Sequence, residues 1–180
     1  MANSELTKRV LADGIKKVME SKAFDKITVT DITDSCGVSR NTFYYHFQDK
    51  YELVNWIFYT EITPIARAAQ GEKGWAAALT ELFCYLRNNR AFYSNVLRFQ
   101  GQNSFSSCLC DFYQSAMRKL IEKDTSGVLT LEEQQFAAKF YSHALIGTVM
   151  DWVSEDMRPD PEEAVATIEK LINGHFSSRS

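Results

Sequence analysis

The stretch CGVSRNTFYYHFQDK spans residues 36–50, and its centre, Phe43 to Phe47, holds four Phe or Tyr residues around His46. An apolar segment just before it ends at Gly37, and glycine takes the positive φ of a helix C-terminus without steric cost. Ser39, two residues later, is a favourable N-cap for a further helix. Two short helices joined by a tight glycine turn are typical of a helix-turn-helix.

Composition favours a helical protein with a packed core. Hydrophobic residues make up 45% of the 180 residues and charged residues 24%, as in ordinary globular proteins. With 8 Gly and 3 Pro, the chain has few turn residues to separate many short strands. No apolar run approaches the roughly 18 residues of a bilayer span, and the N-terminus lacks an apolar signal core. We therefore expect a cytoplasmic protein without a membrane partner.

The charge distribution limits the way in which nucleic acid could be bound. The formal net charge is -3, and residues 1–55 hold 8 basic and 8 acidic residues. A neutral segment cannot bind a polyanion through bulk charge. Any nucleic-acid contact in this segment must be local and geometrically specific.

The cysteine pattern argues against a disulfide framework or a metal site. Cys36, Cys84, Cys108 and Cys110 form no CxxC pair and no regular spacing, so we expect reduced thiols. The pair Cys108 and Cys110 lacks nearby His or Cys partners to complete a tetrahedral site, so we expect neither metal nor cofactor.

Apolar residues at spacings of three and four predict an all-α protein of about nine helices and no convincing strand. Thr130 and Glu133 form a capping box, and Pro161 suits the first position of the last helix. Pro64 is expected to kink or end its helix. The segments that carry these apolar residues are about 6–19, 28–36, 39–47, 50–65, 75–86, 92–97, 105–121, 131–152 and 161–172.

The aromatic run at residues 43–47 fits a core, a catalytic site, a cofactor box or a surface that meets a flat, charged partner. On a helix of 100° per residue, Phe43 and Phe47 lie within about 40° of each other and face inward. The opposite side carries Asn41, Tyr45 and Gln48, and Thr42 and Tyr44 flank them.

This outward side suits the major groove of DNA. The Asn41 amide can pair with adenine, the Thr42 methyl can meet a thymine methyl, and Arg40 can reach guanine or phosphate. The hydroxyls of Tyr44 and Tyr45 and the ring of His46 can bind phosphate oxygens. The alternative is that Tyr44, Tyr45 and His46 are ordinary surface aromatic residues that cap the motif.

Two helix starts flank the proposed reading surface. Lys50 opens the next helix, where a phosphate would meet its ammonium and free backbone N–H groups. Thr28 and Thr30 open the preceding helix and can bind phosphate from the other side. We expect loss of Lys50 to weaken binding to all sequences and to reduce its salt dependence.

The segment from Thr28 to Leu53, TVTDITDSCGVSRNTFYYHFQDKYEL, resembles the DNA-binding signature of TetR/AcrR bacterial transcriptional regulators. The resemblance covers roughly the first 55 residues and rests on GVS, TFYYHF and the lysine before the next helix. It places the family's DNA contacts at the positions just discussed. Asn41 departs from the pattern, since small residues such as glycine or proline are common there, so the operator sequence is expected to differ.

The resemblance implies a homodimer whose last two helices, around 131–155 and 161–176, pack as a four-helix bundle. It implies a DNA-binding domain at residues 1–49 and a helical regulatory and dimerisation domain at residues 50–180. A small-molecule effector would bind within the body, and the partner would be a double-stranded, near-palindromic operator. Aromatic residues that could line the effector pocket are Trp75, Phe92, Tyr93, Phe112, Tyr113 and Tyr141.

A second likeness concerns residues 90–105, RAFYSNVLRFQGQNSF, which are similar to the branch with regulators of dihydroxyacetone kinase genes. That branch includes an activator that works with a kinase-like co-protein, which implies a protein co-regulator as a further partner. Two functions of other classes compare as follows with a DNA-binding regulator. An enzyme is disfavoured because no G-x-S-x-G, H-E-x-x-H or phosphate loop is present. A helical interaction protein whose headpiece no longer binds DNA remains an alternative.

Overall fold

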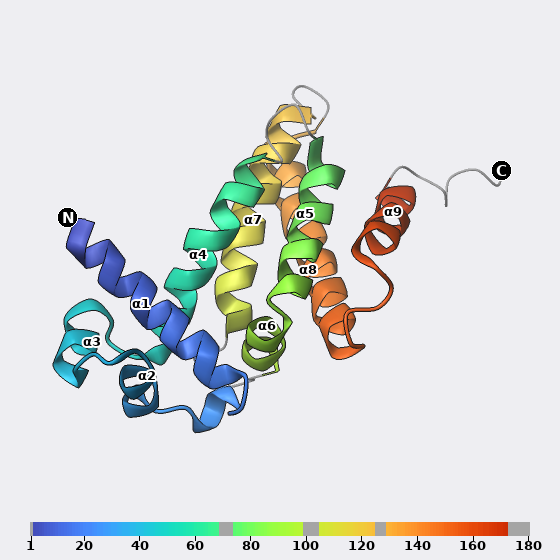
Figure 1. The fold of residues 1–180 in the computed structure, drawn as a ribbon. Helices are drawn as coiled ribbons and strands as arrows, with labels where there is room; N and C mark the ends of the chain where they lie inside the picture. The colour runs from blue at the N-terminus through green and yellow to red at the C-terminus, as the bar shows by residue number, and fades with distance from the viewer. Residues whose placement is uncertain (1, 69–73, 99–104, 125–128, 173–180) are drawn as a thin grey trace. The chain divides into compact units, whose positions relative to one another are not determined.

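The computed structural model describes residues 2–68, 74–98, 105–124 and 129–172, and within them it contains nine α-helices and no strand (Figure 1). The prediction of an all-α fold with about nine helices is confirmed for these residues. In chain order the elements are α1 (Ala2–Met19), the 3-10 turn η1 (Phe24–Lys26), α2 (Val29–Cys36), α3 (Arg40–His46), α4 (Lys50–Ala68), α5 (Gly74–Asn88), α6 (Arg90–Leu97), α7 (Phe105–Asp124), α8 (Leu131–Ser154) and α9 (Pro161–Ile172).

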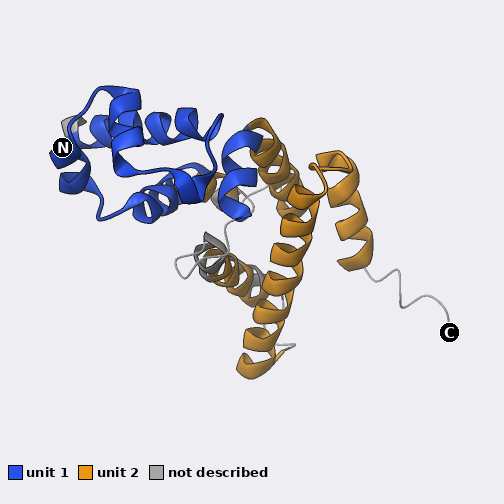
Figure 2. Ribbon diagram, turned by 90° about the horizontal axis from the view of Figure 1, so that it is seen from below, with its two compact units in different colours: residues 1–61, 89–108 blue, residues 62–88, 109–180 orange. Residues whose placement is uncertain are grey.

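The helices form two compact units (Figure 2). The first unit is Met1–Glu61 with Asn89–Cys108, and the second is Ile62–Asn88 with Leu109–Ser180. The first unit therefore takes in the beginning of α4 and all of α6, in addition to α1, α2 and α3. The expected division between residues 49 and 50 separates proposed functions, and it does not coincide with the boundary of the compact units.

The core of the first unit joins the helix-turn-helix to α1 and α4. Leu11 and Ile15 of α1, Ile32 of α2 and Phe43 of α3 are all fully buried, and α1 packs against both α2 and α3. Burying a Leu, Ile or Phe side chain contributes about 1.5–3 kcal/mol each. The stripe predicted from the sequence thus holds the recognition segment on a rigid base.

Gly14 allows α1 and α2 to pack very closely. A Cβ added at this position would lie 2.9 Å from Ser35 Oγ and 3.1 Å from the carbonyl oxygen of Ile32. The first distance is shorter than real Cβ contacts and the second is tighter than most of them, so a side chain at this crossing requires its neighbours to shift.

The ends of α2 and α3 have the caps that the sequence predicts. The Thr28 hydroxyl accepts a bond from Asp31 N, and the Asp31 carboxylate accepts one from Thr28 N, a capping box with Asp in place of Glu. Gly37 ends α2 in the left-handed region at φ 69°. Ser39 caps α3 by accepting a 3.0 Å bond from Thr42 N.

In the second unit, α5 packs against α9, and aromatic residues link α5 to α8. The rings of Phe83 and Trp152 lie 4.6 Å apart, and Trp152 Nε1 donates a 2.7 Å bond to the carbonyl oxygen of Pro159. The predicted capping box of Thr130 and Glu133 at the start of α8 is confirmed.

Pro64 does not end its helix, because α4 continues to Ala68. Proline removes one backbone hydrogen bond, which leaves the carbonyl of Thr60 without its helical partner. Thr60 lies at an exposed position, where water can satisfy that carbonyl.

Among the described residues, every helix is too short or too polar to cross a lipid bilayer.

Candidate nucleic-acid interface

The aromatic run on α3 separates into a buried base and an exposed face, as the sequence predicts. Phe43 is 0% exposed and Phe47, at the C-cap, is 3% exposed. Tyr45 is 83% exposed and Tyr44 is 50% exposed. The two phenylalanines anchor the helix in the core of the first unit, and the two tyrosines project into solvent.

The buried base is extended by aromatic packing towards α4. The Phe47 ring centroid lies 6.0 Å from that of Phe43 and 5.9 Å from that of Trp56 on α4. The ammonium of Lys8 lies over the Phe47 and Trp56 rings at 6.0 and 5.8 Å from their centroids. These contacts fix the orientation of α3 relative to α1 and α4.

The polar side chains of α3 differ in how freely they can meet a partner. Arg40 and Asn41 are exposed. The Thr42 hydroxyl lies 2.9 Å from Ser39 Oγ within the helix cap, so its methyl is the part suited to an external apolar contact. The His46 ring meets the Tyr45 ring edge-on at 4.9 Å, which couples their orientations.

The start of α2 carries a charged network beside the two threonines predicted to bind phosphate. Thr28 and Thr30 are both exposed. The Thr28 hydroxyl donates its proton to Asp31 Oδ2 at 2.7 Å, and Lys22 Nζ donates to the same oxygen at 2.6 Å. The bond from Lys22, followed by those from Thr28, holds the pKa of Asp31 well below its usual range.

At the start of α4, nearby carboxylates accept hydrogen bonds from backbone N–H groups. Asp49 Oδ1 accepts a 2.8 Å bond from Glu52 N, and Glu52 Oε2 accepts a 2.6 Å bond from Gln48 N. Two negative charges at this helix end disfavour an incoming phosphate and occupy N–H groups that it would use.

Lys50 is placed differently from the expectation of a free, phosphate-binding ammonium. Its Nζ donates to the carbonyl oxygens of Phe24 at 2.7 Å, Ile27 at 2.8 Å and Asp25 at 3.2 Å. An ammonium has three protons, so these three bonds use them all. Partial burial lowers the pKa of Lys50, against the charge of Asp25, which raises it.

The outward polar face of α3, mounted on buried Phe43 and Phe47 behind a glycine turn, is the geometry of a DNA-reading helix-turn-helix. The model described as "Bacterial regulatory proteins, tetR family" matches residues 11–57. The model described as "Transcriptional regulator C-terminal region" matches residues 73–174, more than half of the chain. The chain belongs to the TetR family. Members of this family are ligand-responsive, DNA-binding transcriptional regulators.

Similar proteins place this TetR-family chain beside known regulators. It is 33% identical over 96 residues to the HTH-type dhaKLM operon transcriptional activator DhaS of Lactococcus lactis subsp. lactis. That alignment covers 53% of this chain and 51% of the relative, so the match spans about half of the relative's length. It agrees with the likeness of residues 90–105 to regulators of dihydroxyacetone kinase genes.

Solved structures share the fold. The dihydroxyacetone kinase operon activator DhaS has a TM-score of 0.73 at 24% identity, covering 93% of this chain and 94% of that one. The fatty acid degradation regulator FadR of Bacillus halodurans also has a TM-score of 0.73, at 17% identity, covering 96% and 97%. NalD, a repressor from Pseudomonas aeruginosa, has a TM-score of 0.68 at 17% identity, covering 95% and 97%. At these identities the likeness concerns the fold alone.

The six aromatic residues expected to line an effector pocket of this TetR-family protein do not share one environment. Phe92 and Tyr93 are buried in the first unit. In the second unit, Tyr113 is buried, Trp75 and Phe112 are half-buried, and Tyr141 is 38% exposed. Their role in ligand binding stays a prediction.

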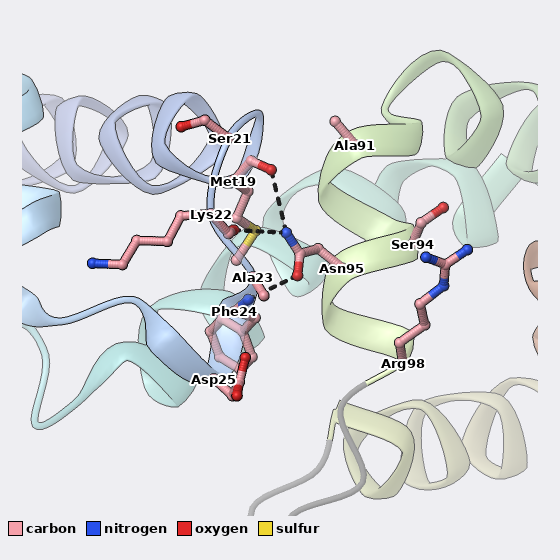
Figure 3. A pocket seen from close by; sticks show the side chains of 10 residues that line it. All are labelled: Met19, Ser21, Lys22, Ala23, Phe24, Asp25, Ala91, Ser94, Asn95 and Arg98. Carbon is pink, nitrogen blue, oxygen red and sulfur yellow. Dashed lines mark hydrogen bonds between the residues drawn. The ribbon is translucent and has the colours of Figure 1, made fainter.

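Two of the cavities in the described part of the chain lie elsewhere, and none of the six residues lines either. One, of about 380 Å³, lies between α7 and α8 and is lined by Gln114, Ser115, Arg118, Gln135 and Ala138. The other, of about 620 Å³, is open and lies between α6 and the connection from α1 to α2 (Figure 3).

Asn95 of α6, in the wall of the larger cavity, is a residue that the sequence analysis missed. Figure 3 shows its amide directed at the connection between α1 and α2. Oδ1 accepts a 2.7 Å bond from Phe24 N, and Nδ2 donates to the carbonyl oxygens of Lys22 at 3.0 Å and Met19 at 3.2 Å. An asparagine among the apolar residues of a short helix was the available signal, but its partners lie over seventy residues away.

In the part of the chain that the structure describes, no group of three or more His, Cys, Asp or Glu side chains is arranged to hold a metal ion. Cys36, Cys84 and Cys110 are free thiols in half-buried positions. Burial raises the pKa of the Cys36 thiol, which keeps it protonated and less reactive. Cys108, the partner in the CxC pair, has a side chain outside the described residues.

Proposed function

We propose that this chain is a homodimeric regulator that reads a near-palindromic operator with the exposed face of α3. The observation that carries the proposal is the outward projection of Tyr44 and Tyr45 from a helix anchored by buried Phe43 and Phe47. A face of this kind offers hydrogen-bonding groups to a duplex while the helix itself stays rigid.

The proposed contacts divide into base reading and phosphate binding. Asn41 pairs with a base edge, the Thr42 methyl meets a thymine methyl, and Arg40 reaches guanine or a neighbouring phosphate. The phosphate contacts come from exposed or half-exposed side chains on either side of the groove: Thr28, Thr30, Tyr44, Tyr45 and His46. Lys50 is left out of this set because its three protons are already bonded.

The proposed dimer forms through α8 and α9. Phe136 and Phe140, four residues apart on α8, are 74% and 59% exposed, and Leu171 and Ile172 near the end of α9 are 49% and 45% exposed. Large apolar side chains at this exposure favour burial against a second copy. Further along the face of Phe136 and Phe140, Gly147 has open space around it, which lets a partner helix approach closely.

Two recognition helices in such a dimer would enter successive major grooves about 34–36 Å apart, which requires an operator with two-fold symmetry. A small molecule that binds better to a different spacing shifts the population away from the DNA-competent state. Coupling of this kind is worth roughly 1–3 kcal/mol. The chain would act in the cytoplasm, where bacterial DNA lies.

The likeness to DhaS, named as an activator, supports a role within the same branch. In that role a protein co-regulator would be a partner beside the small-molecule effector. Co-purification with the products of neighbouring genes tests this part of the proposal separately from DNA binding.

The decisive experiment is selection of bound duplexes from a randomised pool, read out by gel shift. Recovery of a palindrome with half-sites one helical turn apart is the expected result. Recovery of no preferred sequence by a dimeric, folded protein would favour a helical interaction protein whose headpiece no longer binds DNA.

A further inference from the structure

The connection between α1 and α2, residues 20–28, is held from two sides by side chains distant in sequence. Asn95 of α6 bonds to Phe24 N from one side, and Lys50 of α4 bonds to Phe24 O from the other, each at 2.7 Å. The backbone N–H and C=O groups of Phe24 are therefore bonded to side chains of two different helices.

The Lys50 ammonium sits in a compact cage. Beside its three carbonyl bonds, it lies 4.8 Å from the centroid of the Phe24 ring and 5.5 Å from that of Tyr51. These two rings pack edge to face at 5.2 Å. Carbonyl oxygens and aromatic faces both stabilise a cation, and the cage replaces the water that Lys50 would otherwise bind.

Asn95 has a complementary role on the other side of the same connection. The carbonyl of Met19 lies at the C-terminal end of α1 and that of Lys22 in the turn that follows, where helical partners run out. The Asn95 amide group satisfies both carbonyls and also binds Phe24 N. Together, Asn95 and Lys50 bond five backbone groups of the connection and the last carbonyl of α1.

The bonded connection leads directly into α2 and the recognition helix. Lys50 binds the carbonyl oxygen of Ile27, and Ile27 immediately precedes Thr28, the N-cap of α2. A change in the backbone path of residues 20–28 would therefore displace α2 and, through the glycine turn, α3.

We propose that Lys50 and Asn95 are positioning residues for DNA reading: they set the path of residues 20–28, and Lys50 does so in place of binding a phosphate. The proposal rests on the proposed function, because it concerns how the reading face is presented. It differs from the sequence-based expectation in assigning the Lys50 charge to the protein's own backbone.

The salt dependence of operator binding separates the two roles of Lys50. Losing a phosphate contact would reduce the slope of log affinity against log salt by roughly 0.9. We expect Lys50→Met to keep the wild-type slope and to lower operator affinity by about tenfold or more, since three bonds from a charged donor are lost. A reduced slope would overturn the proposal.

Lys50→Arg gives a second, independent arm that preserves the charge. A planar guanidinium serves a phosphate as well as an ammonium does, but it cannot place three donors at one point inside the carbonyl cage. We expect Lys50→Arg to lose affinity nearly as Lys50→Met does. Wild-type affinity in Lys50→Arg would contradict the cage.

Asn95→Leu tests the other side, with Ser94→Ala as the matched control. Ser94 neighbours Asn95 on α6 and lines the same cavity. Affinities are measured well below the melting temperature. We expect Asn95→Leu to reduce the ratio of operator affinity to random-duplex affinity, and Ser94→Ala to leave this ratio unchanged. A lowered melting temperature with an unchanged ratio would indicate a merely structural role and overturn the proposal.

Chemical labelling of the wild-type protein requires no substitution and therefore no assumption about folding. Lysines are acetylated by an amine-reactive ester with and without operator DNA and quantified by mass spectrometry. Lys50 should react slowly in both states, whereas Lys26, whose side chain is 75% exposed, should react quickly in the free protein.

Rapid labelling of Lys50 in the free protein, with or without protection by DNA, would overturn the proposal. If the duplex selection recovers no operator, the proposed function fails, and labelling of the free protein still tests the cage itself. The failures of the two proposals are therefore distinguishable.

Discussion

Ser35 Oγ on α2 donates a 3.0 Å hydrogen bond to the carbonyl oxygen of Gly14 on α1, so the two helices meet with almost no side chain between them. The same hydroxyl lies 2.7 Å from the carbonyl oxygen of Ile32, so the two carbonyls share its single proton. This crossing sets the distance between the first helix and the helix-turn-helix.

Gly14→Ala should destabilise the protein. The added methyl group would crowd Ser35 Oγ and the Ile32 carbonyl, and overpacking of this kind costs about 1–3 kcal/mol. The higher helix propensity of alanine recovers at most about 1 kcal/mol. Urea unfolding of the variant measures the difference. If the crowding is real, Ser35→Ala should rescue part of the loss, so the two substitutions would be non-additive.

Asp31→Asn should flatten the acid dependence of stability. The carboxylate has an ordinary pKa of 3.8, which its bonds to Lys22 and Thr28 lower in the folded state. Its contribution to stability is therefore present above the unfolded pKa and is lost as pH falls below about 4 towards the folded value. Wild type should exceed Asp31→Asn in unfolding free energy at pH 7, and the gap should narrow at pH 3. A gap that stays constant with pH would contradict the assignment.

Asn41→Ala should relax the operator sequence at one position of each half-site. Loss of a bidentate contact to a base removes about 1–3 kcal/mol of discrimination. The measurement is affinity for operators in which each base pair is changed in turn. Tyr45→Phe is the comparison, because removing only a hydroxyl from an 83% exposed ring should weaken all duplexes alike. Uniform weakening by Asn41→Ala would remove it from the base-reading set.

Phe140→Glu should dissociate the dimer while leaving each protomer folded. Its ring is 59% exposed, so the substitution disturbs little of the protomer's own core. A charge in the proposed apolar interface of α8 and α9 should raise the dimer dissociation constant by more than about tenfold, as at other interface hot spots. Sedimentation measures the change. Leu6→Glu, at a site 61% exposed on α1, is the matched control and should leave the dimer intact.

The order and type of the helices could be predicted from the sequence because local signals specify them. Gly37 at the turn, Ser39 as cap and the Thr130–Glu133 capping box act within four residues, and the structure has each in its expected place. The partition of α3 into buried and exposed sides follows from the helix period alone. Residues such as Tyr45 were therefore placed correctly.

The contacts of Lys50 and Asn95 were decided only by tertiary structure. Lys50 bonds to carbonyls 23 to 26 residues away, and Asn95 bonds to groups 71 to 76 residues away. A sequence pattern reports which groups could bind a phosphate. It does not report which of them the folded backbone has already engaged, because that depends on how distant segments are brought together in space.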